Sequence, residues 1–565
     1  MEEIRIYCEN DSDYKKVYAG TSLKELSDDV CPAIQGQRVI AALVDNKLKE
    51  LDYRLYHTHN IRFISYEHAD GRRTYIRSLC FVLQNVIREL YPDKVLSIDY
   101  SLPSGLYCEL REVIPHEDGR PHAYVLSEED LCLIKDKMED IISRDLPFKK
   151  VKMMPEEAVK LYSDNKQPEK ISLLQSVGRF TYNVYFLDGK ADTFYGPLAP
   201  SSGYLDVFDI SAFNKGFCLQ YPMDGYSGTV LPTKRQSKIA AALKEHSDWC
   251  ATIGVRGIGG LNKAVLDGSV VDLINLSEAL HEKKYAEIAE MIYERRNSVK
   301  IVFIAGPSSS GKTSTSKRIA LQCRILGMNP KVVELDNYFV NREHTPKDEN
   351  GEYDFEALKA MDLDFLGRQL NDLLAGKEIE IPRFDFKEGK RFFDGKKMRL
   401  LEKDILIMEG IHALNPDMIP GVDSSKVFRV YASALTSLSI DENNNISTSD
   451  NRMLRRMIRD NRTRGINPEQ TLMMWQSVRR GENRNIFPYQ ENADVVFNSA
   501  HIFELPVLKY YAEPLLRRIR PTSEAYTEAT RMLKFLNYIV AMNPEEMAVI
   551  PPTSILREFI DGQVL

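Results

Sequence analysis

Short apolar runs predict the buried strands of an α/β domain in the second half of the chain. Residues 301–305 are apolar throughout, and residues 331–335 and 404–410 each contain a shorter apolar run. Runs of this kind are typical of parallel strands that helices cover on both faces. Residues 313–326 predict a helix with one apolar face made by Ile319, Ala320, Cys323 and Leu326. We therefore expect a parallel sheet within residues 298–510.

The first sixty residues predict a smaller unit of short strands around one helix. Apolar and polar residues alternate over residues 4–7, Ser22 is suited to cap a short helix, and residues 39–44 form an apolar strand before a turn. This order is typical of a ubiquitin-like β-grasp domain over residues 1–62. The pattern fits other small α+β domains equally well.

The middle of the chain predicts a second α+β domain and a helical connector. Residues 63–230 contain a helix near residues 75–90. Residues 231–297 are mostly helical, and we expect them to pack the two halves together through the apolar stripe Leu276, Leu280, Ile288 and Ile292. Residues 511–565 predict a C-terminal helical segment, and the polar run at 441–445 predicts a loop.

Composition narrows the class of protein. The chain has 565 residues, 43% of them hydrophobic and 28% charged, which predicts three or four ordinary globular domains. Its net charge of −7 disfavours a generally nucleic-acid-binding surface. Eight scattered cysteines without a C-x-x-C pair predict reduced thiols. The sequence shows no secretory signal and no apolar run of membrane-spanning length, so we expect a cytoplasmic protein without a membrane partner.

A glycine-rich stretch lies between the strand at 301–305 and the helix that follows it. It reads G-x-x-x-x-G-K-[ST], a phosphate-binding loop (P-loop) whose backbone N–H groups surround phosphates. In this pattern Lys312 reaches the terminal phosphates and Thr313 faces Mg²⁺. The alternative is a glycine-rich turn without a ligand, which the surrounding strand and helix disfavour. The predicted nucleotide-binding residues here are Gly306, Ser308, Ser309, Ser310, Gly311, Lys312, Thr313 and Ser314.

Two carboxylates follow the next two strands at their carboxyl ends, where ligands gather in open α/β sheets. Asp336 follows residues 331–335 and is placed to accept the proton of an attacking hydroxyl in phosphoryl transfer. A loop or helix-capping Asp is the alternative. Glu409 closes the apolar run at 404–410 and is placed to hold Mg²⁺ directly or through water, with a purely structural role as the alternative.

Six arginines crowd residues 452–464 together with Asp460. At helical spacing, Arg452, Arg456 and Arg459 share one face. Such runs usually belong to a solvated basic helix and less commonly to a nucleic-acid-binding one. Beside a P-loop, the more specific interpretation is a lid whose arginines stabilise the transferring phosphoryl group and exclude water.

Ordered blocks from residue 298 to about 500 resemble the uridine kinase/phosphoribulokinase family. The blocks are residues 306–313, 335–338, 353–355, 382–386, 408–411, 455–460, 464–465 and 493–495. The resemblance implies a P-loop kinase that uses Mg²⁺ and ATP or GTP to phosphorylate a nucleoside or polyol. It implies Asp336 as general base and Asp354 as the residue that holds the acceptor's sugar. It further implies Lys312 for catalysis, Thr313 and Glu409 for the metal, Asp494 for the nucleotide, and the lid arginines Arg456, Arg459 and Arg464.

The acceptor-binding block departs from the family pattern Y-D-F-x-x-H-S-R. Phe384 stands in place of the tyrosine and Gly389 in place of the histidine that contact the pyrimidine, whereas Arg391 is kept. Ile466 stands in place of the second arginine of the usual R-G-R, with Arg462 as a candidate replacement. We therefore predict Phe384 and Arg391 as substrate-binding residues in a pocket that recognises a sugar or polyol better than a base.

The N-terminal half resembles threonyl-tRNA synthetases. Residues 1–62 resemble the TGS domain that these enzymes share with some GTPases, and residues 63–230 resemble their editing-like second domain. The positions of the editing metal ligands are occupied by Arg77, Phe81, Phe194 and Leu198. Asp192 is the one possible metal ligand that survives in the second motif, and zinc needs three or four ligands, so we predict no metal-dependent editing.

Two functions from different classes compete. The first is an ATP- or GTP-dependent kinase acting on a nucleoside or polyol. The second is a nucleotide-switched protein whose N-terminal half docks RNA, a ribosome or a signalling nucleotide, with slow hydrolysis as a timer. The acceptor-side carboxylates favour the kinase, and eleven acidic against eight basic residues among the first sixty disfavour tRNA binding there. We expect the N-terminal half to serve regulation, ligand sensing or assembly, and the protein to form a homo-oligomer.

Overall fold

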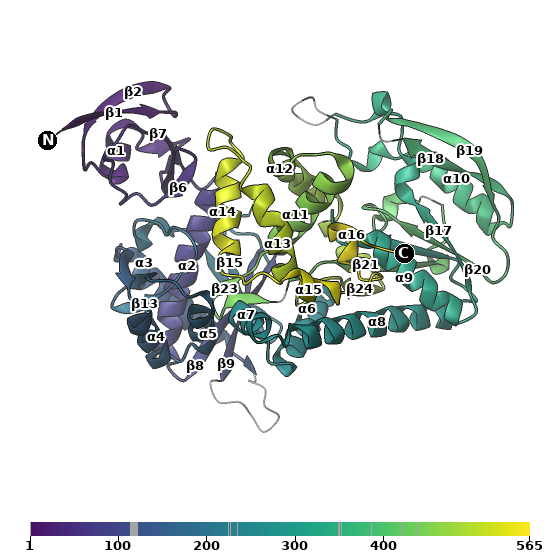
Figure 1. Cartoon of the computed structure of the whole chain (residues 1–565), viewed down its shortest axis with the longest axis horizontal. Helices are drawn as coiled ribbons and strands as arrows, with labels where there is room; N and C mark the ends of the chain where they lie inside the picture. Colours follow the sequence, from purple (N-terminus) through teal and green to yellow (C-terminus); the bar gives the residue numbers. More distant parts are fainter. Residues whose placement is uncertain are drawn as a thin grey trace.

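The computed structural model describes residues 2–112, 123–223, 225–226, 228–233, 236–347, 351, 353–385, 387–419, 421–436 and 438–565. They form an N-terminal half and a C-terminal α/β domain. The last helices of the chain, drawn in yellow, lie between these two parts (Figure 1).

The C-terminal domain is built on a five-stranded sheet whose neighbouring strands are all parallel. The strand order is β17 (Asn329–Glu334), β20 (Asp404–Glu409), β16 (Ile301–Ala305), β21 (Val427–Ser433) and β24 (Val495–Asn498). One face is covered by α8 (Val270–Glu294) and α9 (Lys312–Ile325), the other by α6 (Ser237–Thr252) and α10 (Leu363–Leu374). Because both faces are covered, β16 and β20 are buried along their whole length. The predicted fold class is confirmed.

The first residues form a mixed sheet packed on one helix. The order is β2 (Asp13–Tyr18), β1 (Glu3–Cys8), β7 (Asn60–Ile64), β5 (Ala41–Val44) and β6 (Lys47–Lys49), with β1 and β7 parallel. The helix α1 (Leu23–Val30) begins at Ser22, whose hydroxyl accepts the N–H of Glu25 while the Glu25 carboxylate accepts the N–H of Ser22. The cap by Ser22 is the one that the sequence predicts, the return contact from Glu25 completes a capping box, and the unit has the predicted β-grasp arrangement.

The second part of the N-terminal half surrounds the long helix α2 (Ala69–Leu90). Its main sheet has the order β10 (Ala123–Tyr124), β9 (Gly105–Glu112), β15 (Gly216–Gln220) and β14 (Asp209–Phe213), with β8 (Lys94–Leu102) also paired to β9. A smaller sheet contains β11 (Lys149–Met153), β12 (Tyr182–Leu187) and β13 (Lys190–Asp192). Helix α3 (Glu128–Ser143) packs with α2 in one hydrophobic core.

The apolar stripe predicted for the connector is wrong in its first half. Leu276 is 47% exposed and Leu280 is half-buried, whereas Ile288 and Ile292 are buried as predicted. Ser277 and His281 face the core instead. They do so because each has a polar partner there: Ser277 bonds the Nδ1 atom of His501 at 2.8 Å, and His281 stacks on the ring of His501. Hydrophobicity alone does not reveal such pairs.

The C-terminal helices share a hydrophobic core with the rest of the molecule. They are α13 (Glu504–Leu516), α14 (Tyr526–Leu536), α15 (Pro544–Ala548) and α16 (Arg557–Ile560). The core joins them to α7 (Ile258–Asp267), α11 (Thr448–Arg459) and α12 (Pro468–Asn485). Within the described ranges, no helix combines the length and the apolar character needed to cross a membrane.

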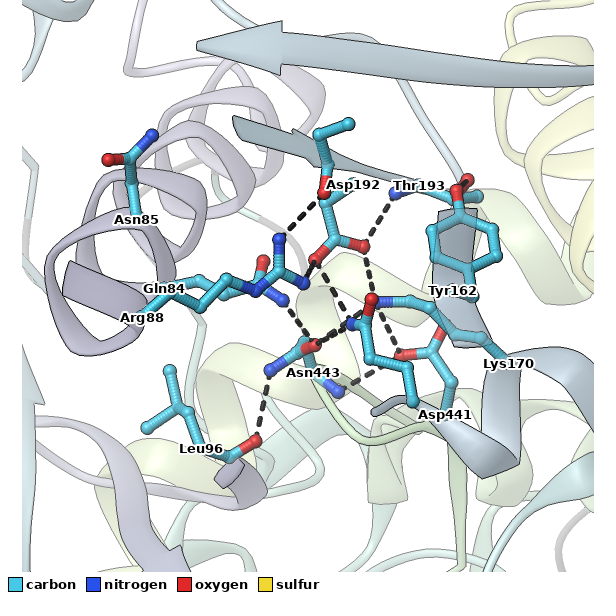
Figure 2. Close-up of polar contacts among 12 residues, drawn as sticks. Gln84, Asn85, Arg88, Leu96, Tyr162, Lys170, Asp192, Thr193, Asp441 and Asn443 are labelled. Atoms are coloured by element: carbon cyan, nitrogen blue, oxygen red, sulfur yellow. Dashed lines mark hydrogen bonds and ion pairs between the residues drawn. The ribbon is translucent and has the colours of Figure 1, made fainter. Parts of the chain in front are cut away.

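The polar run at 441–445, predicted as a loop, lies instead in a hairpin inserted into the N-terminal half. Its strands are β22 (Ser439–Asp441) and β23 (Asn444–Asn445). Figure 2 shows Asn443 of this hairpin in a polar cluster around Asp192. The Asn443 side chain accepts from Gln84 at 2.6 Å and from Lys170 at 3.0 Å, and it donates to a backbone carbonyl of β8 at 3.0 Å. The hairpin is buried because its polar groups have these partners.

Asp192, the survivor of the editing motif, anchors this cluster. Its carboxylate pairs with Lys170 of α5 (Pro168–Val177) and, at 2.9 Å, with Arg88 of α2. These two cations hold the pKa of the buried Asp192 carboxyl below its usual range against the opposing effect of burial. The hairpin leads directly into α11, so the N-terminal half is tied to the helix that carries the predicted lid arginines.

Candidate active site

The P-loop connects β16 to α9 and has the backbone shape of an anion cradle. A side chain at Gly306 would lie 2.0 Å from the carbonyl oxygen of Ala432 in β21, so this position has room only for glycine. Ser309 and Gly311 take left-handed conformations, with φ of +59° and +80°. Successive N–H groups in such turns point into one concavity. The cradle opens at the N-terminus of α9, where the helix dipole favours negative charge.

Two hydroxyl groups in the loop are suited to a phosphate ligand. The Oγ atoms of Ser309 and Ser310 are buried, and neither has a hydrogen-bond partner among the described residues. Buried polar atoms are rarely left without a partner in a complete complex. The ammonium group of Lys312 lies 3.4 Å from the carbonyl oxygen of Pro307, which places it over the loop. The residues therefore fit the triphosphate that the sequence predicts.

Thr313 and Glu409 meet at the adjacent carboxyl ends of β16 and β20. The Thr313 hydroxyl donates to the Glu409 carboxylate at 2.6 Å. Burial raises the pKa of Glu409 to about 7, and the nearby Asp336 adds to that rise while Lys312 opposes it. Mg²⁺ takes oxygen ligands and commonly binds through one or two protein groups together with phosphates and water. These two side chains fit that role.

Asp336 stands directly after β17, as predicted. Burial raises the pKa of its carboxyl, and the charge of Lys312 opposes this rise. Since Lys312 also acts on Glu409, the three side chains surround one space at the carboxyl edge of the sheet. A carboxylate at this edge of the sheet is suited to accept the proton of a hydroxyl that attacks a phosphate held by the loop.

Glu356 is a member of the site that the sequence did not indicate. It packs against the backbone of Gly481, where an added Cβ would lie 2.5 Å from the Cβ of Glu356. Burial and the charge of Glu482 raise the pKa of Glu356 to about 7, while Arg456 and Lys312 act in the opposite direction. The carboxylate of Asp354 accepts the N–H of Glu356 at 3.1 Å and so shapes the loop that presents it. The sequence signal for Glu356 was its position two residues after Asp354. The contact of Asp354 with an acceptor sugar stays a prediction.

The raised pKa values of Glu356 and Glu409 predict a pH dependence of stability. Both groups are protonated in the folded protein up to about pH 7 but ionise near pH 4.5 when unfolded. Their contribution to the free energy of unfolding is therefore complete below pH 4.5 and is lost as the pH rises to 7. Between pH 5 and 8, the free energy of unfolding of the nucleotide-free protein should fall by roughly 1–3 kcal/mol less in Glu356→Gln than in wild type. Urea unfolding measures this difference. The exposed Glu388→Gln serves as control, and parallel profiles for wild type and Glu356→Gln would contradict the assignment.

The predicted lid arginines divide into two groups. Arg452 and Arg455 are buried and paired with Glu482 and Glu504 respectively, so they are fixed in the core. Arg456 instead donates to the Ser308 hydroxyl of the P-loop at 2.7 Å. The remaining cations gather on a single carboxylate, that of Asp460, which lies 3.2 Å from Arg456, 2.9 Å from Arg459 and 3.6 Å from Arg464. The helix changes to a π turn over Asp460–Arg464, a feature common at functional sites.

Two predicted positions lie away from the site. Asp494 stands at the start of β24, where its carboxylate accepts the N–H of Arg429 at 2.7 Å and pairs with Arg295 at 3.0 Å. The P-loop follows the carboxyl end of β16, whereas Asp494 lies at the amino end of β24, so this position disfavours the predicted contact with the nucleotide. Arg462 donates to the Asp561 carboxylate and to the backbone carbonyl of residue 558, both at 3.0 Å, so it does not replace the missing lid arginine.

The C-terminus of the chain covers the nucleotide side of the P-loop. The Ser314 hydroxyl donates to the carboxylate of Glu558, and the Ser314 N–H lies 3.4 Å from the same oxygen. Gln563 donates to the Ser314 hydroxyl at 2.7 Å. Ile555 fills the space above Gly311, where an added Cβ would lie 2.3 Å away. A carboxylate therefore occupies the first turn of α9, at a residue that the sequence assigned to the nucleotide.

Glu558 is expected to weaken nucleotide binding, because its charge opposes that of the phosphates. In a partly exposed site, two like charges repel by about 1 kcal/mol or more. We expect Glu558→Gln to tighten the binding of a non-hydrolysable ATP analogue about fivefold in calorimetry. Glu545→Gln, exposed on α15, is the matched control. Equal or weaker binding by Glu558→Gln would show that this carboxylate does not compete with phosphate.

The predicted acceptor-side residues lie on a hairpin of β18 (Ile379–Asp385) and β19 (Lys390–Met398). Phe384 packs edge-on against Phe339, and its N–H donates to Asn337, the neighbour of Asp336, at 3.2 Å. Arg391 is opposite Phe384 in the hairpin and pairs with Asp362 at 2.8 Å. Phe386 of the same block lies outside the described residues. The hairpin thus places Phe384 and Arg391 next to each other, and Phe384 contacts the neighbour of Asp336.

Two further side chains on the acceptor side were not indicated by the sequence. Gly389 has φ of +68°, and an added Cβ would lie 2.7 Å from the Nε atom of Arg342. The Arg342 side chain therefore occupies the space that the family's histidine would need. His412, three residues after Glu409, is buried, and burial lowers its pKa to about 4. It is thus a neutral imidazole close to the site.

The four positions of the editing motif come together in the N-terminal half, as the resemblance implies. The rings of Phe81 and Phe194 lie 5.2 Å apart, and Leu198 shares their hydrophobic core. The Nε atom of Arg77 donates to the carbonyl oxygen of Pro197 at 3.1 Å. The side chains at these positions are apolar or cationic, which supports the prediction that they do not bind zinc.

Comparison with known proteins divides the chain into the same two parts. Residues 301–504 match the model of the Phosphoribulokinase / Uridine kinase family. A uridine kinase of Macrococcus caseolyticus is 29% identical over 197 residues, which cover 35% of this chain and 86% of that protein. A threonine–tRNA ligase of Rubrobacter xylanophilus is 29% identical over 225 residues, and these cover 39% of this chain but only 33% of that enzyme.

Among solved structures, one described as a possible uridine kinase from Bacillus stearothermophilus has a TM-score of 0.24 and 18% sequence identity, covering 35% of this chain and 89% of its own. The family match and the similarity to the ligase are sequence findings, and on these the chain joins a domain of the phosphoribulokinase/uridine kinase family to an N-terminal region similar to part of threonine–tRNA ligases.

Proposed function

We propose that this fusion of a phosphoribulokinase/uridine kinase-family domain with a threonine–tRNA ligase-like region is a Mg²⁺-dependent kinase. It transfers the terminal phosphoryl group of ATP or GTP to a hydroxyl of a nucleoside or related polyol. The observation that carries the proposal is the convergence of Asp336, Lys312 and the Thr313–Glu409 pair on one space at the mouth of the P-loop. The scattered cysteines are all free, which supports the predicted cytoplasmic location. The homo-oligomer stays a prediction.

In the proposed reaction, Asp336 accepts the proton of the attacking hydroxyl. Its raised pKa brings the carboxyl closer to the pH of the cell, which improves a general base. Lys312 and the backbone N–H groups of the loop hold the phosphates in line with that hydroxyl. Thr313 and Glu409 would hold Mg²⁺, which when bound would supply positive charge for the phosphoryl oxygens.

Arg456, Arg459 and Arg464 supply the remaining positive charge. Asp460 balances one of these three cations, and the net charge left over lies beside Ser308 at the mouth of the loop. Guanidinium groups held in place before the reaction stabilise the transferring phosphoryl group without reorganising. The pairs that Arg452 and Arg455 form in the core keep α11 in position during this step.

The acceptor pocket is proposed to recognise hydroxyl groups rather than a pyrimidine. Phe384 lacks the tyrosine hydroxyl, and Arg342 lies in the space that the histidine would need. A pocket discriminates strongly only through polar groups that would otherwise be left unpaired. With the two base-contacting groups replaced, selectivity for the base is expected to be low.

An acceptor panel tests this proposal. We would measure kcat/KM by coupled ADP release for uridine, cytidine, purine nucleosides and free polyols. The expected result is turnover with several acceptors that share a hydroxyl pattern, with base preferences of less than about tenfold. A preference for uridine and cytidine of several hundredfold would show that other residues rebuild the pyrimidine contacts.

A further inference from the structure

A cleft of about 940 Å³ separates the N-terminal half from the helices of the C-terminal part. One wall is the face of α2 that carries Arg73 and Arg77, and the opposite walls are faces of α12 and α14. The hairpin that contains Asn443 and the first turn of α11 form its floor. Figure 1 shows α2, α12 and α14 coming from three different parts of the chain. The cleft exists only in the assembled fold.

Arginine dominates the charge of this cleft. The described residues that line it include seven arginines and five carboxylates. Three of these carboxylates are occupied by two of the arginines: Asp70 pairs with Arg73, Asp450 pairs with Arg531, and Glu528 pairs with both arginines. Glu67 accepts from Gln37 and from a backbone N–H.

Three arginines of the cleft form no ion pair within the part of the chain that the structure describes. They are Arg72, Arg77 and Arg480. Arg72 lies over the ring of Tyr66, and its Nε atom is buried without a hydrogen-bond partner. Arg480 is exposed on α12 at the mouth of the cleft. The cleft therefore has cationic groups that the protein itself does not neutralise.

Arg77 is held rigidly by neutral partners. Its Nε atom donates to the carbonyl oxygen of Pro197 at 3.1 Å, and its Nη2 atom donates to Thr74 at 3.2 Å. The guanidinium packs so closely on Gly196 that an added Cβ there would lie 2.5 Å from its Cζ atom. Burial lowers the pKa of Arg77 to about 10, and the nearby Asp70 carboxylate, which is itself paired with Arg73, opposes this shift. A half-buried cation that forms no ion pair of its own is costly, and a bound anion would supply a direct partner.

The remaining lining residues indicate what kind of anion fits. Aromatic side chains from both halves line the same space: Phe194, Tyr195, Tyr221, Trp475 and Phe535. Guanidinium groups match the oxygens of phosphates in bidentate geometry, and aromatic faces suit a planar ring. The volume lies in the range of small-molecule sites. We propose that this cleft is a second ligand site, separate from the P-loop, that binds a nucleoside phosphate.

The cleft is separate from the P-loop but physically connected to it. Trp475 lines the cleft, and the Arg452 guanidinium lies over the Trp475 ring. The same guanidinium donates to the backbone carbonyl oxygen of Ser308 in the P-loop. Arg479, another lining residue, lies 3.6 Å from Glu482, whose carboxylate accepts the N–H of Ser308. A ligand that attracts Arg479 would thus weaken the contact between Arg479 and Glu482, the carboxylate that contacts the P-loop. Binding at the two sites is therefore expected to be coupled, and by linkage the coupling is reciprocal.

The test measures binding to the full-length protein carrying Lys312→Ala, which weakens the P-loop site and makes the result independent of any kinase activity. ADP and uridine monophosphate are titrated calorimetrically, with uridine as the probe that lacks phosphate. We expect one equivalent of each nucleotide to bind and uridine to bind at least tenfold more weakly. Arg77→Gln should weaken nucleotide binding at least tenfold and Arg480→Gln about threefold.

Arg296→Gln, an exposed arginine at the far end of α8, is the matched control and should leave binding unchanged. Arg480→Gln keeps the test valid if Arg77→Gln disturbs folding, because Arg480 is exposed. The proposal is overturned if neither nucleotide binds, if both cleft variants bind like their parent, or if uridine binds as tightly as the nucleotides.

Discussion

Asp336→Asn is expected to lower turnover by about 10²–10⁴-fold while leaving nucleotide affinity nearly unchanged, because a general base contributes about that much to the rate. The substitution keeps the size of the side chain but removes its capacity to accept the proton. Lys312 and the Thr313–Glu409 pair, which we assign to the nucleotide and the metal, stay in place. Steady-state turnover and binding of a non-hydrolysable analogue, measured on the same preparation, separate the two effects.

Asp364→Asn is the matched control for this substitution. Asp364 is an exposed carboxylate in the first turn of α10, in the same domain but turned to solvent. It should leave turnover within about twofold of wild type, as surface substitutions usually do. If Asp336→Asn also retained full turnover, Asp336 would not be the base.

Arg456→Gln is expected to lower turnover by about 10²–10³-fold, since an arginine that stabilises the transferring phosphoryl group contributes on this scale or above. Arg456 contacts the P-loop through Ser308 and shares Asp460 with Arg459 and Arg464. Its effect should appear in kcat more than in nucleotide affinity, because the charge that it stabilises develops in the transition state.

Arg462→Gln provides a control from the same segment. This arginine contacts Asp561 and the backbone of residue 558 in the C-terminal segment rather than the P-loop. We expect its turnover to stay within about threefold of wild type. Equal losses for Arg456→Gln and Arg462→Gln would indicate that the whole segment acts by its charge and that Arg456 has no specific contact with the phosphoryl group.

The sequence predicted the parts of the site that depend on local patterns. The strand at 301–305, the P-loop and the helix after it are consecutive, and their apolar and glycine spacing indicates one structure. Asp336 and Glu409 were predicted because the carboxyl ends of neighbouring parallel strands meet at one edge. The helix cap by Ser22 was likewise predicted from the local sequence.

The parts that could not be predicted depend on contacts between distant residues. Glu558 reaches Ser314 across 244 positions of the chain, and no local pattern indicates which surface the C-terminus covers. Glu356 enters the site because it packs on Gly481, which lies within α12, far from Glu356 in the sequence. The block that contains Asp494 indicates that a strand is present but does not indicate which of its ends carries a ligand, and Asp494 lies at the end away from the P-loop.

The N-terminal half illustrates the same limit. Its motif comparison correctly indicated that Arg77, Phe81, Phe194 and Leu198 lie together. It did not indicate that Asp192 would help to bind a hairpin of the other half. Lys170 pairs with Asp192 and donates to Asn443 of that hairpin, as Figure 2 shows. That contact makes the two halves one folded unit. A ligand on the N-terminal side is thus in a position to influence α11, which follows the hairpin directly.

The central claim is that a small-molecule hydroxyl, and not water, receives the phosphoryl group. The most direct measurement compares ADP release with and without each acceptor and quantifies the phosphorylated acceptor by mass spectrometry in the same reaction. The account predicts that at least one nucleoside or polyol raises ADP release more than about tenfold, with one phosphorylated acceptor per ADP and loss of both products in Asp336→Asn. Slow ADP release that no acceptor changes and that Asp336→Asn leaves intact would contradict it and favour a nucleotide-switched protein.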